Sequence, residues 1–199
     1  MRKVLFLSIV TFVIGSLSLA KAQRGGGAPA APPMTMTVAG FPDGSDIPVK
    51  YSQAAPGVPT GEGTSPEIKW ANVPPGTQTF VLNMHDMDAS RNKTTEDQAH
   101  WVVWNIPGTA TGLPEGVPKG LNRPDGSYQQ SATGDMYRGP GAAANGPKHH
   151  YVFELYALDT KLDVKPGADA FESRTNVMKA IQGHVIGKAV YLGLFRRPQ

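Results

Sequence analysis

The sequence predicts an all-β-dominated fold, an antiparallel β-sandwich that carries one or two short helices. Short apolar segments alternate with turn signals throughout residues 34–195, which is typical of such sandwiches. The 23 glycines and 18 prolines form about a fifth of the 199 residues. This content favours many turns, but it is below the roughly 25–30% that indicates disorder. The length suits one domain with its own core.

Six segments have the apolar content and the flanking turns of β-strands. Prolines and glycines mark the turns between them. The predicted strands are residues 34–38, 47–51, 79–84, 101–106, 150–158 and 188–195. Residues 113–145 resemble a loop, because glycines and prolines occur throughout. A connection of this length is usually functional or mobile.

One helix is predicted near the C-terminus. Asp169 is suited to cap its start, and Gly183 is suited to end it. A second short helix over residues 90–99 is a weaker prediction. The apolar residues of the first helix recur near helical spacing, at Phe171, Val177, Met178 and Ile181.

The N-terminus has the pattern of a secretory signal. Arg2 and Lys3 precede an uncharged, largely apolar run over residues 4–20, and residues 20–22 have the small-x-small pattern of a cleavage site. We therefore expect a signal peptide over residues 1–22, cleaved after Ala22, and a periplasmic or secreted protein. An uncleaved membrane anchor is the alternative. Residues 23–33 are predicted to form a flexible Gly/Ala/Pro leader, and residues 34–199 the folded domain.

The charge and the lack of cysteine exclude several function classes. The formal net charge is +3, but removing residues 1–22 takes away three bases and no acid, which leaves 16 bases and 16 acids. A neutral mature chain gives no reason to expect nucleic-acid binding. The mature chain also contains no segment that could span a membrane. Without cysteine there is no disulfide, thiolate zinc site, thiol nucleophile or lipid-attachment site.

Polar side chains gather at the ends of predicted strands. Asp86 and Asp88 follow one strand, His100 directly precedes the next, and His149 and Tyr151 open a third. A structural interpretation stays open for each of them: the acids could cap a turn, the histidines could be hydrogen-bonded packing residues, and the tyrosine could belong to the core.

The strand that begins with this histidine and tyrosine has two distinct faces. Strand alternation places His149, Tyr151, Phe153 and Leu155 on one face, and His150, Val152, Glu154 and Tyr156 on the other. Trp70, Trp101 and Trp104 are expected in the core, and the sequence shows no partner for His85 or His184.

Several blocks of sequence resemble the phosphatidylethanolamine-binding protein family, which includes the Raf kinase inhibitor protein in animals and has a bacterial branch of similar size. The resemblance covers about residues 34–195, and the blocks occur in the order of the family. They are residues 65–70 with 73–77, 85–90, 100–107, 137–141 and 148–159.

The resemblance implies a β-sandwich of that family's type with a small anion pocket for a phosphate or phospholipid-type head group. By motif position, its ligand-binding residues are Asp86, His100, Gly139, Gly141, His149 and Tyr151. Imidazoles and a phenol donate to phosphate oxygens, and glycines let backbone N–H groups approach an anion. A neighbouring acid would orient the histidines or raise their pKa. We expect no catalytic residue, no metal and no cofactor.

Three features depart from the family pattern. Met87 and Ser90 replace both prolines of the Asp-Pro-Asp-Ala-Pro motif, and His150 stands where an arginine is usual. Residues 142–144 are alanines where a proline pair is expected. The resemblance therefore predicts the fold more directly than it predicts which ligand is bound.

The sequence thus favours a binding protein without turnover, whose partner is an anionic small molecule or a phospholipid head group. If His100 and His149 contact the ligand, affinity should rise as the pH falls. One alternative is a metal-assisted or acid–base hydrolase that uses Asp86, His100 and His149. Another alternative is a protease inhibitor with a cleavable loop in residues 113–145, which would make a protease a second possible partner.

Overall fold

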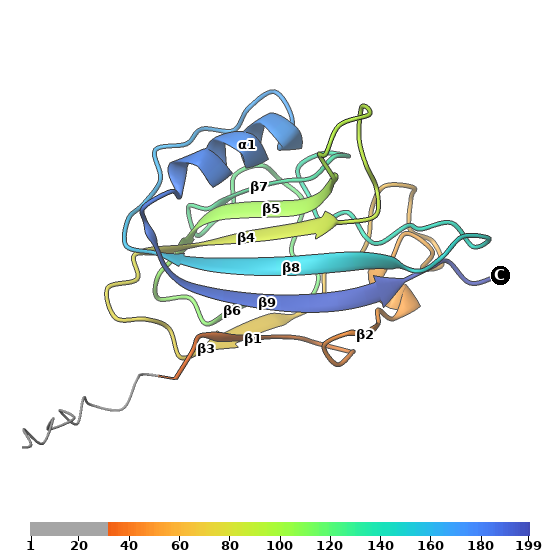
Figure 1. The fold of residues 1–199 in the computed structure, drawn as a ribbon, viewed down its shortest axis with the longest axis horizontal. Coiled ribbons are helices and arrows are strands. Elements are labelled where there is room, and N and C mark those ends of the chain that lie inside the picture. Colours follow the sequence, from red (N-terminus) through yellow and green to blue (C-terminus); the bar gives the residue numbers. More distant parts are fainter. Residues whose placement is uncertain (1–31) are drawn as a thin grey trace, which may run out of the picture. The chain divides into compact units, whose positions relative to one another are not determined.

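The structure is a computed structural model that describes residues 32–199. The predicted signal peptide and nearly all of the predicted leader lie outside the described residues. The described chain forms two β-sheets and one α-helix (Figure 1). The smaller sheet has the order β1 (Thr35–Val38), β3 (Ile68–Ala71), β6 (Gly112–Leu113). The larger has the order β2 (Ser45–Asp46), β9 (Val185–Phe195), β8 (His149–Leu158), β4 (Thr79–Asp86), β5 (Gln98–Pro107), β7 (Tyr128–Gln130).

The predicted sandwich is confirmed, with one parallel strand pair. All strand pairs are antiparallel except β2 with β9. Alternation along β4 sends Phe80, Leu82 and Met84 into a core shared with the smaller sheet, whereas Val81 joins a second core beneath the helix. Both faces of the larger sheet therefore carry apolar side chains, and its central strands are almost completely buried.

Helix α1 (Ala170–Ala180) confirms the predicted helix and its cap. The Asp169 carboxylate accepts from the backbone N–H groups of Phe171 and Glu172. Val177 and Ile181 are buried against the larger sheet, and Gly183 adopts a φ of 83° beyond the helix end. Within residues 32–199, no helix combines the length and the apolar character that crossing a bilayer requires.

The predicted strand at residues 47–51 is wrong. Pro48, with a φ of −58°, instead precedes a 3-10 helix over Val49–Tyr51. The Pro48 carbonyl accepts from the Tyr51 N–H at 3.0 Å, so the chain turns here and does not extend. This turn buries the Tyr51 ring in the sandwich core.

The second helix, predicted over residues 90–99, is also wrong. Asn92 and Lys93 adopt φ values of 50° and 58°, which a right-handed helix cannot include. They form the tip of the connection between β4 and β5, where the Arg91 N–H donates to the Glu96 carbonyl. Strand β5 then begins at Gln98.

Four short strands were not predicted. These are β2, β3, β6 and β7, and β7 lies within the segment that resembles a loop. Gln129 in β7 is fully buried, and its side-chain amide donates to the Pro118 and Gly120 carbonyls. Residues 113–145 are therefore tied to the domain at their centre, which does not favour a freely accessible inhibitory loop.

A bulge in β5 controls the direction of His100. Met84 pairs with Trp101 and His85 pairs with Ala99, so His100 is an extra residue in the β5 strand. Ala99 consequently faces the helix side, while the His100 ring contacts Tyr151 on the sandwich side. The bulge thus turns the histidine toward the residues that the sequence groups with it.

Candidate functional site

The predicted site residues converge at one end of the central strands β8, β4 and β5 of the larger sheet. Asp86 ends β4 and pairs in register with Tyr151 near the start of β8. His149 is two residues before Tyr151 and shares its face of the strand, as predicted. His100 arrives from β5, and its ring stands edge-on to the Tyr151 ring with 5.0 Å between centroids. Residues distant in sequence thus form one cluster.

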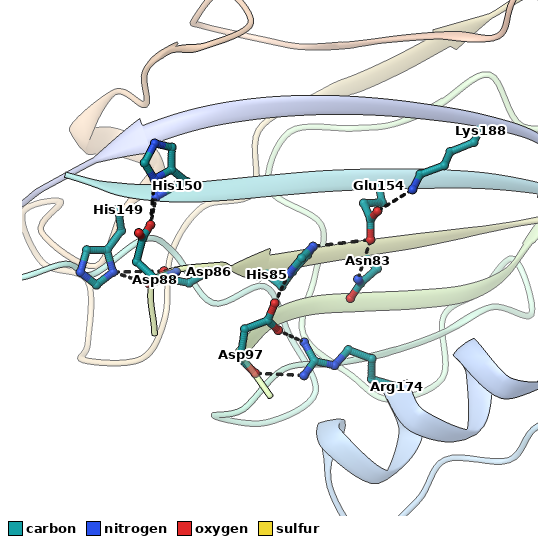
Figure 2. A network of polar contacts seen from close by, with 10 residues as sticks. All are labelled: Asn83, His85, Asp86, Asp88, Asp97, His149, His150, Glu154, Arg174 and Lys188. Atoms are coloured by element: carbon teal, nitrogen blue, oxygen red, sulfur yellow. Dashed lines mark hydrogen bonds and ion pairs between the residues drawn. The ribbon is translucent and has the colours of Figure 1, made fainter. Parts of the chain in front are cut away.

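Asp86 and His149 form the polar centre of this cluster (Figure 2). The His149 Nδ1 lies 2.8 Å and 3.1 Å from the two Asp86 carboxylate oxygens. The Asp86 side chain is 6% exposed and the His149 side chain is 24% exposed. Because a carboxylate only accepts hydrogen bonds, the proton of this pair lies on Nδ1. The His149 Nε2 is therefore left for a ligand.

Tyr151 is fixed by the loop over residues 139–142, called the rim loop below. Its hydroxyl oxygen accepts from the Gly141 and Ala142 N–H groups at 3.1 Å and 3.2 Å. Burial raises the pKa of Tyr151, and the nearby Asp86 charge raises it further. The hydroxyl therefore keeps its proton at neutral pH and can act as a donor.

The pKa of His100 does not follow the expectation that a neighbouring acid would raise it. Burial instead lowers the pKa of His100 to about 4, so its ring is neutral at neutral pH. Its Nδ1 lies 2.9 Å from the Arg138 carbonyl, which can only accept, so Nδ1 carries the proton. The Nε2 is then an acceptor. Neutral His100 cannot donate to a phosphate oxygen, contrary to the predicted role.

Gly139 and Gly141 line the rim loop, but their amides already have partners. The Gly139 N–H donates to the Glu62 carbonyl, and the Gly141 N–H donates to Tyr151. A Cβ on Gly139 would lie 2.8 Å from the Tyr51 carbonyl oxygen, and one on Gly141 would lie 2.5 Å from the Gln53 side chain. These glycines permit close packing of the loop, whereas the sequence predicts free N–H donors.

Arg138 is a site residue that the sequence analysis missed. Its backbone N–H donates to the His100 carbonyl, and its buried Nε has no hydrogen-bond partner among the described residues. Within residues 32–199 its guanidinium makes no ion pair. Burial lowers the pKa of Arg138, while its electrostatic interactions with Tyr151 and Asp86 act to raise it. The only signal in the sequence is its place inside the block of residues 137–141.

The acidic groups of the cluster offer one possible metal site. Ligand atoms of Asp86, Asp88 and His149 lie within 4.8 Å of one another. His100, which the hydrolase alternative requires, is not part of this group. The Asp88 carboxylate accepts from the His150 N–H and lies 2.9 Å from the His150 Nδ1. Both carboxylates are therefore already engaged by histidines.

Other predictions about single residues have clear outcomes. Trp70, Trp101 and Trp104 are buried, as expected. His85 and His184 do have acidic partners, which the sequence did not show. The Nδ1 of His85 lies 2.5 Å from Asp97, and the Nδ1 of His184 lies 2.8 Å from Asp159.

Comparisons with known proteins agree with this fold. Residues 37–196 match the family model described as phosphatidylethanolamine-binding protein. A UPF0098 protein of Methanothermobacter thermautotrophicus is 40% identical over 166 residues, which cover 82% of this chain and 99% of the relative. The crystal structure of Escherichia coli YbcL, described as a new member of the mammalian PEBP family, matches with a TM-score of 0.64 and 26% identity over 82% of this chain and 98% of that chain. A putative lipoprotein LppC of Mycobacterium tuberculosis is 31% identical over 157 residues, which cover 78% of this chain and 71% of the relative.

Proposed function

The chain belongs to the phosphatidylethanolamine-binding protein family, and on this premise we propose that it binds a phosphate-containing head group without turning it over. The proposed binding residues are Asp86, His100, His149 and Tyr151 together with the rim loop at Gly139 and Gly141. Arg138 is added to this set. Family membership supports the fold and the general class of ligand, and the geometry of the cluster supports the assignment of residues.

The observation that carries the proposal is the Arg138 guanidinium near the Asp86–His149 pair, which has no ion-pair partner in the part of the chain that the structure describes. A half-buried cation without an acceptor favours an anion from solution, because the ion pair satisfies its exposed N–H groups. The Tyr151 hydroxyl adds a neutral donor. The His149 Nε2 becomes a charge-assisted donor when the ring takes up a second proton.

The acceptors in the cluster restrict the ligand further. The Asp86 carboxylate and the His100 Nε2 accept hydrogen bonds, whereas Arg138 and Tyr151 donate them. A head group that carries both a phosphate and an ammonium group can use both sets. We therefore expect a zwitterionic phosphodiester to bind better than inorganic phosphate.

We further propose that the protein acts outside the cytoplasm. The N-terminal sequence pattern supports export, and the relative LppC carries the description of a putative lipoprotein. This chain has no cysteine to carry a lipid. N-terminal sequencing of the protein purified from its own cells is expected to begin at Gln23. Retention of Met1 would contradict cleavage after Ala22.

Neither alternative function gains a supporting observation among residues 32–199. The metal set of the hydrolase is not assembled with His100, and the centre of the predicted inhibitory loop is buried. The binding proposal therefore stands as the function that the described residues support best.

Calorimetric titration with glycerophosphoethanolamine at pH 7 tests the binding proposal. This probe is a soluble zwitterionic phosphodiester. The His149→Gln variant keeps a polar side chain but removes the imidazole whose Nε2 is left for the ligand. It is expected to bind the probe about fivefold more weakly than wild type, because a lost hydrogen bond to the ligand costs about 1 kcal/mol.

The matched control is His184→Gln. His184 also pairs with an aspartate through Nδ1, but it follows α1 and lies away from the cluster. Its variant should retain the wild-type affinity. Equal affinities of wild type and His149→Gln, or no binding by wild type, would refute the proposed site.

A further inference from the structure

A polar groove lies on the opposite face of the larger sheet from the proposed site, between α1, strand β4 and Asp97, which directly precedes β5. Its volume is about 490 Å³, which is within the roughly 300–1,000 Å³ of small-molecule sites. Asn83 and His85 of β4 form its floor, two residues apart on one face of the strand. Asp86 and Tyr151 belong to the other face, so the groove is separate from the proposed head-group site.

One buried polar atom in the groove, the Asn83 Oδ1, has no hydrogen-bond partner among residues 32–199. The Asn83 side-chain amide is oriented by its nitrogen, which donates to the Glu154 carboxylate at 3.2 Å, and this leaves the oxygen unpaired. Asn83 is 4% exposed. The neighbouring His85 Nε2 is also buried and faces the same Glu154 carboxylate at 3.5 Å. Leaving the Asn83 oxygen unsatisfied costs about 1–3 kcal/mol, so its position on the floor of a groove points to a ligand.

The rest of the floor is held rigidly by ion pairs (Figure 2). The His85 Nδ1 contacts Asp97 at 2.5 Å, and Asp97 also accepts from the Arg174 guanidinium of α1. On its other side His85 lies 3.5 Å from Glu154, which pairs with Lys188. The floor is therefore pre-organised, and a ligand would not have to order it.

Helix α1 supplies two polar side chains along the rim. Thr175 and Lys179 line the groove four residues apart, which places them on one face of the helix. Gln182 lies beyond the helix end, and its side-chain amide donates to the Met178 carbonyl. Within residues 32–199, the Lys179 Nζ and the Thr175 hydroxyl have no side-chain hydrogen bond or ion pair. The cations Arg174 and Lys179 outnumber the one lining carboxylate, Asp97, even before His85 is counted.

From these features we propose that the groove binds a small hydroxylated organic anion, such as a sugar acid. Its carboxylate would pair with Lys179, and one of its hydroxyls would donate to the Asn83 Oδ1 beside His85. Met178 is the one apolar lining residue, which gives an aromatic or aliphatic ligand little to pack against.

NMR titration of the ¹⁵N-labelled mature protein with D-gluconate tests this proposal. The expected result is a saturable shift of the Asn83 side-chain amide and the His85 ring nitrogens. Acetate, which lacks hydroxyls, and myo-inositol, which lacks charge, should each bind at least tenfold more weakly. Lys179→Gln should weaken gluconate binding about tenfold. Lys165→Gln, an exposed lysine that lines a different cavity, should not change it.

Three results would overturn the proposal: no shift at Asn83 and His85, equal affinity for acetate or inositol, or equal affinity of wild type and Lys179→Gln. His149→Gln separates this site from the head-group site, because it should leave gluconate binding unchanged. Loss of gluconate binding in that variant would mean that the anion occupies the head-group site and that the groove is empty.

Discussion

His100 is the residue for which chemistry inferred from the sequence and chemistry in the structure differ most. Its spacing from the other polar residues predicts a donor to phosphate. Burial and the Arg138 carbonyl instead make it a neutral acceptor at Nε2. Sequence reasoning could place it in the cluster, because it precedes a strand. It could not assign the tautomer, which depends on a backbone contact 38 residues away.

NMR titration of the histidine ring nitrogens checks this assignment. His100 is expected to remain the neutral Nδ1–H tautomer from pH 8 down to pH 5, and to take up a second proton near pH 4. The reason is that burial disfavours the charged ring. A midpoint near the ordinary histidine value of about 6.5 would contradict this assignment.

A second prediction for a single residue concerns Gly139 in the rim loop. Gly139→Ala should lower the free energy of unfolding by about 1–3 kcal/mol, because the added Cβ would clash with the backbone of Tyr51 and Ser52. Gly146→Ala is the matched control, since its Cβ would meet only the Ala143 carbonyl oxygen, at an ordinary 3.6 Å. Urea unfolding measures both. Equal stability of the two variants would show that the rim loop can move away from Tyr51 and Ser52, which would contradict its role in fixing Tyr151.

For helices and strands, the prediction from sequence agrees with the structure where the signal lies within the element's own residues. Helix α1 was predicted because its cap and its apolar spacing are contained in its own sequence. The segment 47–51 was not, because Pro48 ends the extended chain at a point that apolar content does not reveal. Strands β3, β6 and β7 have two to four residues, and they exist only through pairing with distant partners.

The ion pairs that join α1 to the sheet predict a dependence of stability on pH. Burial lowers the pKa of His85, but its contacts with Asp97 and Glu154 outweigh burial and raise the pKa to about 9. A raised folded-state pKa means that the stabilisation is fully present below about pH 6.5 and is lost as the pH rises through about 9. The free energy of unfolding of wild type should therefore fall by up to about 3 kcal/mol relative to that of His85→Gln over this pH range.

Denaturant unfolding of both proteins between pH 6 and pH 9.5 measures this difference. His184→Gln is again the control, because its pair with Asp159 is exposed and such pairs contribute less than about 1 kcal/mol. A constant difference between wild type and His85→Gln across the range would mean that the histidine is not charged in the folded protein.

For the whole molecule, the order of the sequence blocks was the strongest signal. It identified the family and the sandwich, and the family match over residues 37–196 agrees with it. The blocks also placed Asp86 and His149 together, because antiparallel neighbours bring the end of one strand to the start of the next. The groove beneath α1 was not foreseen, since it depends on how the helix lies over the sheet.

The central claim is that the cluster at Asp86, His149 and Arg138 holds a phosphate-containing head group. A crystal structure of the mature protein with glycerophosphoethanolamine tests it most directly. The phosphate is expected within hydrogen-bond distance of the His149 Nε2 and the Arg138 guanidinium, with the ammonium group toward Asp86. A phosphate bound elsewhere, for instance at Lys179 in the groove beneath α1, with the cluster free of ligand, would contradict the claim.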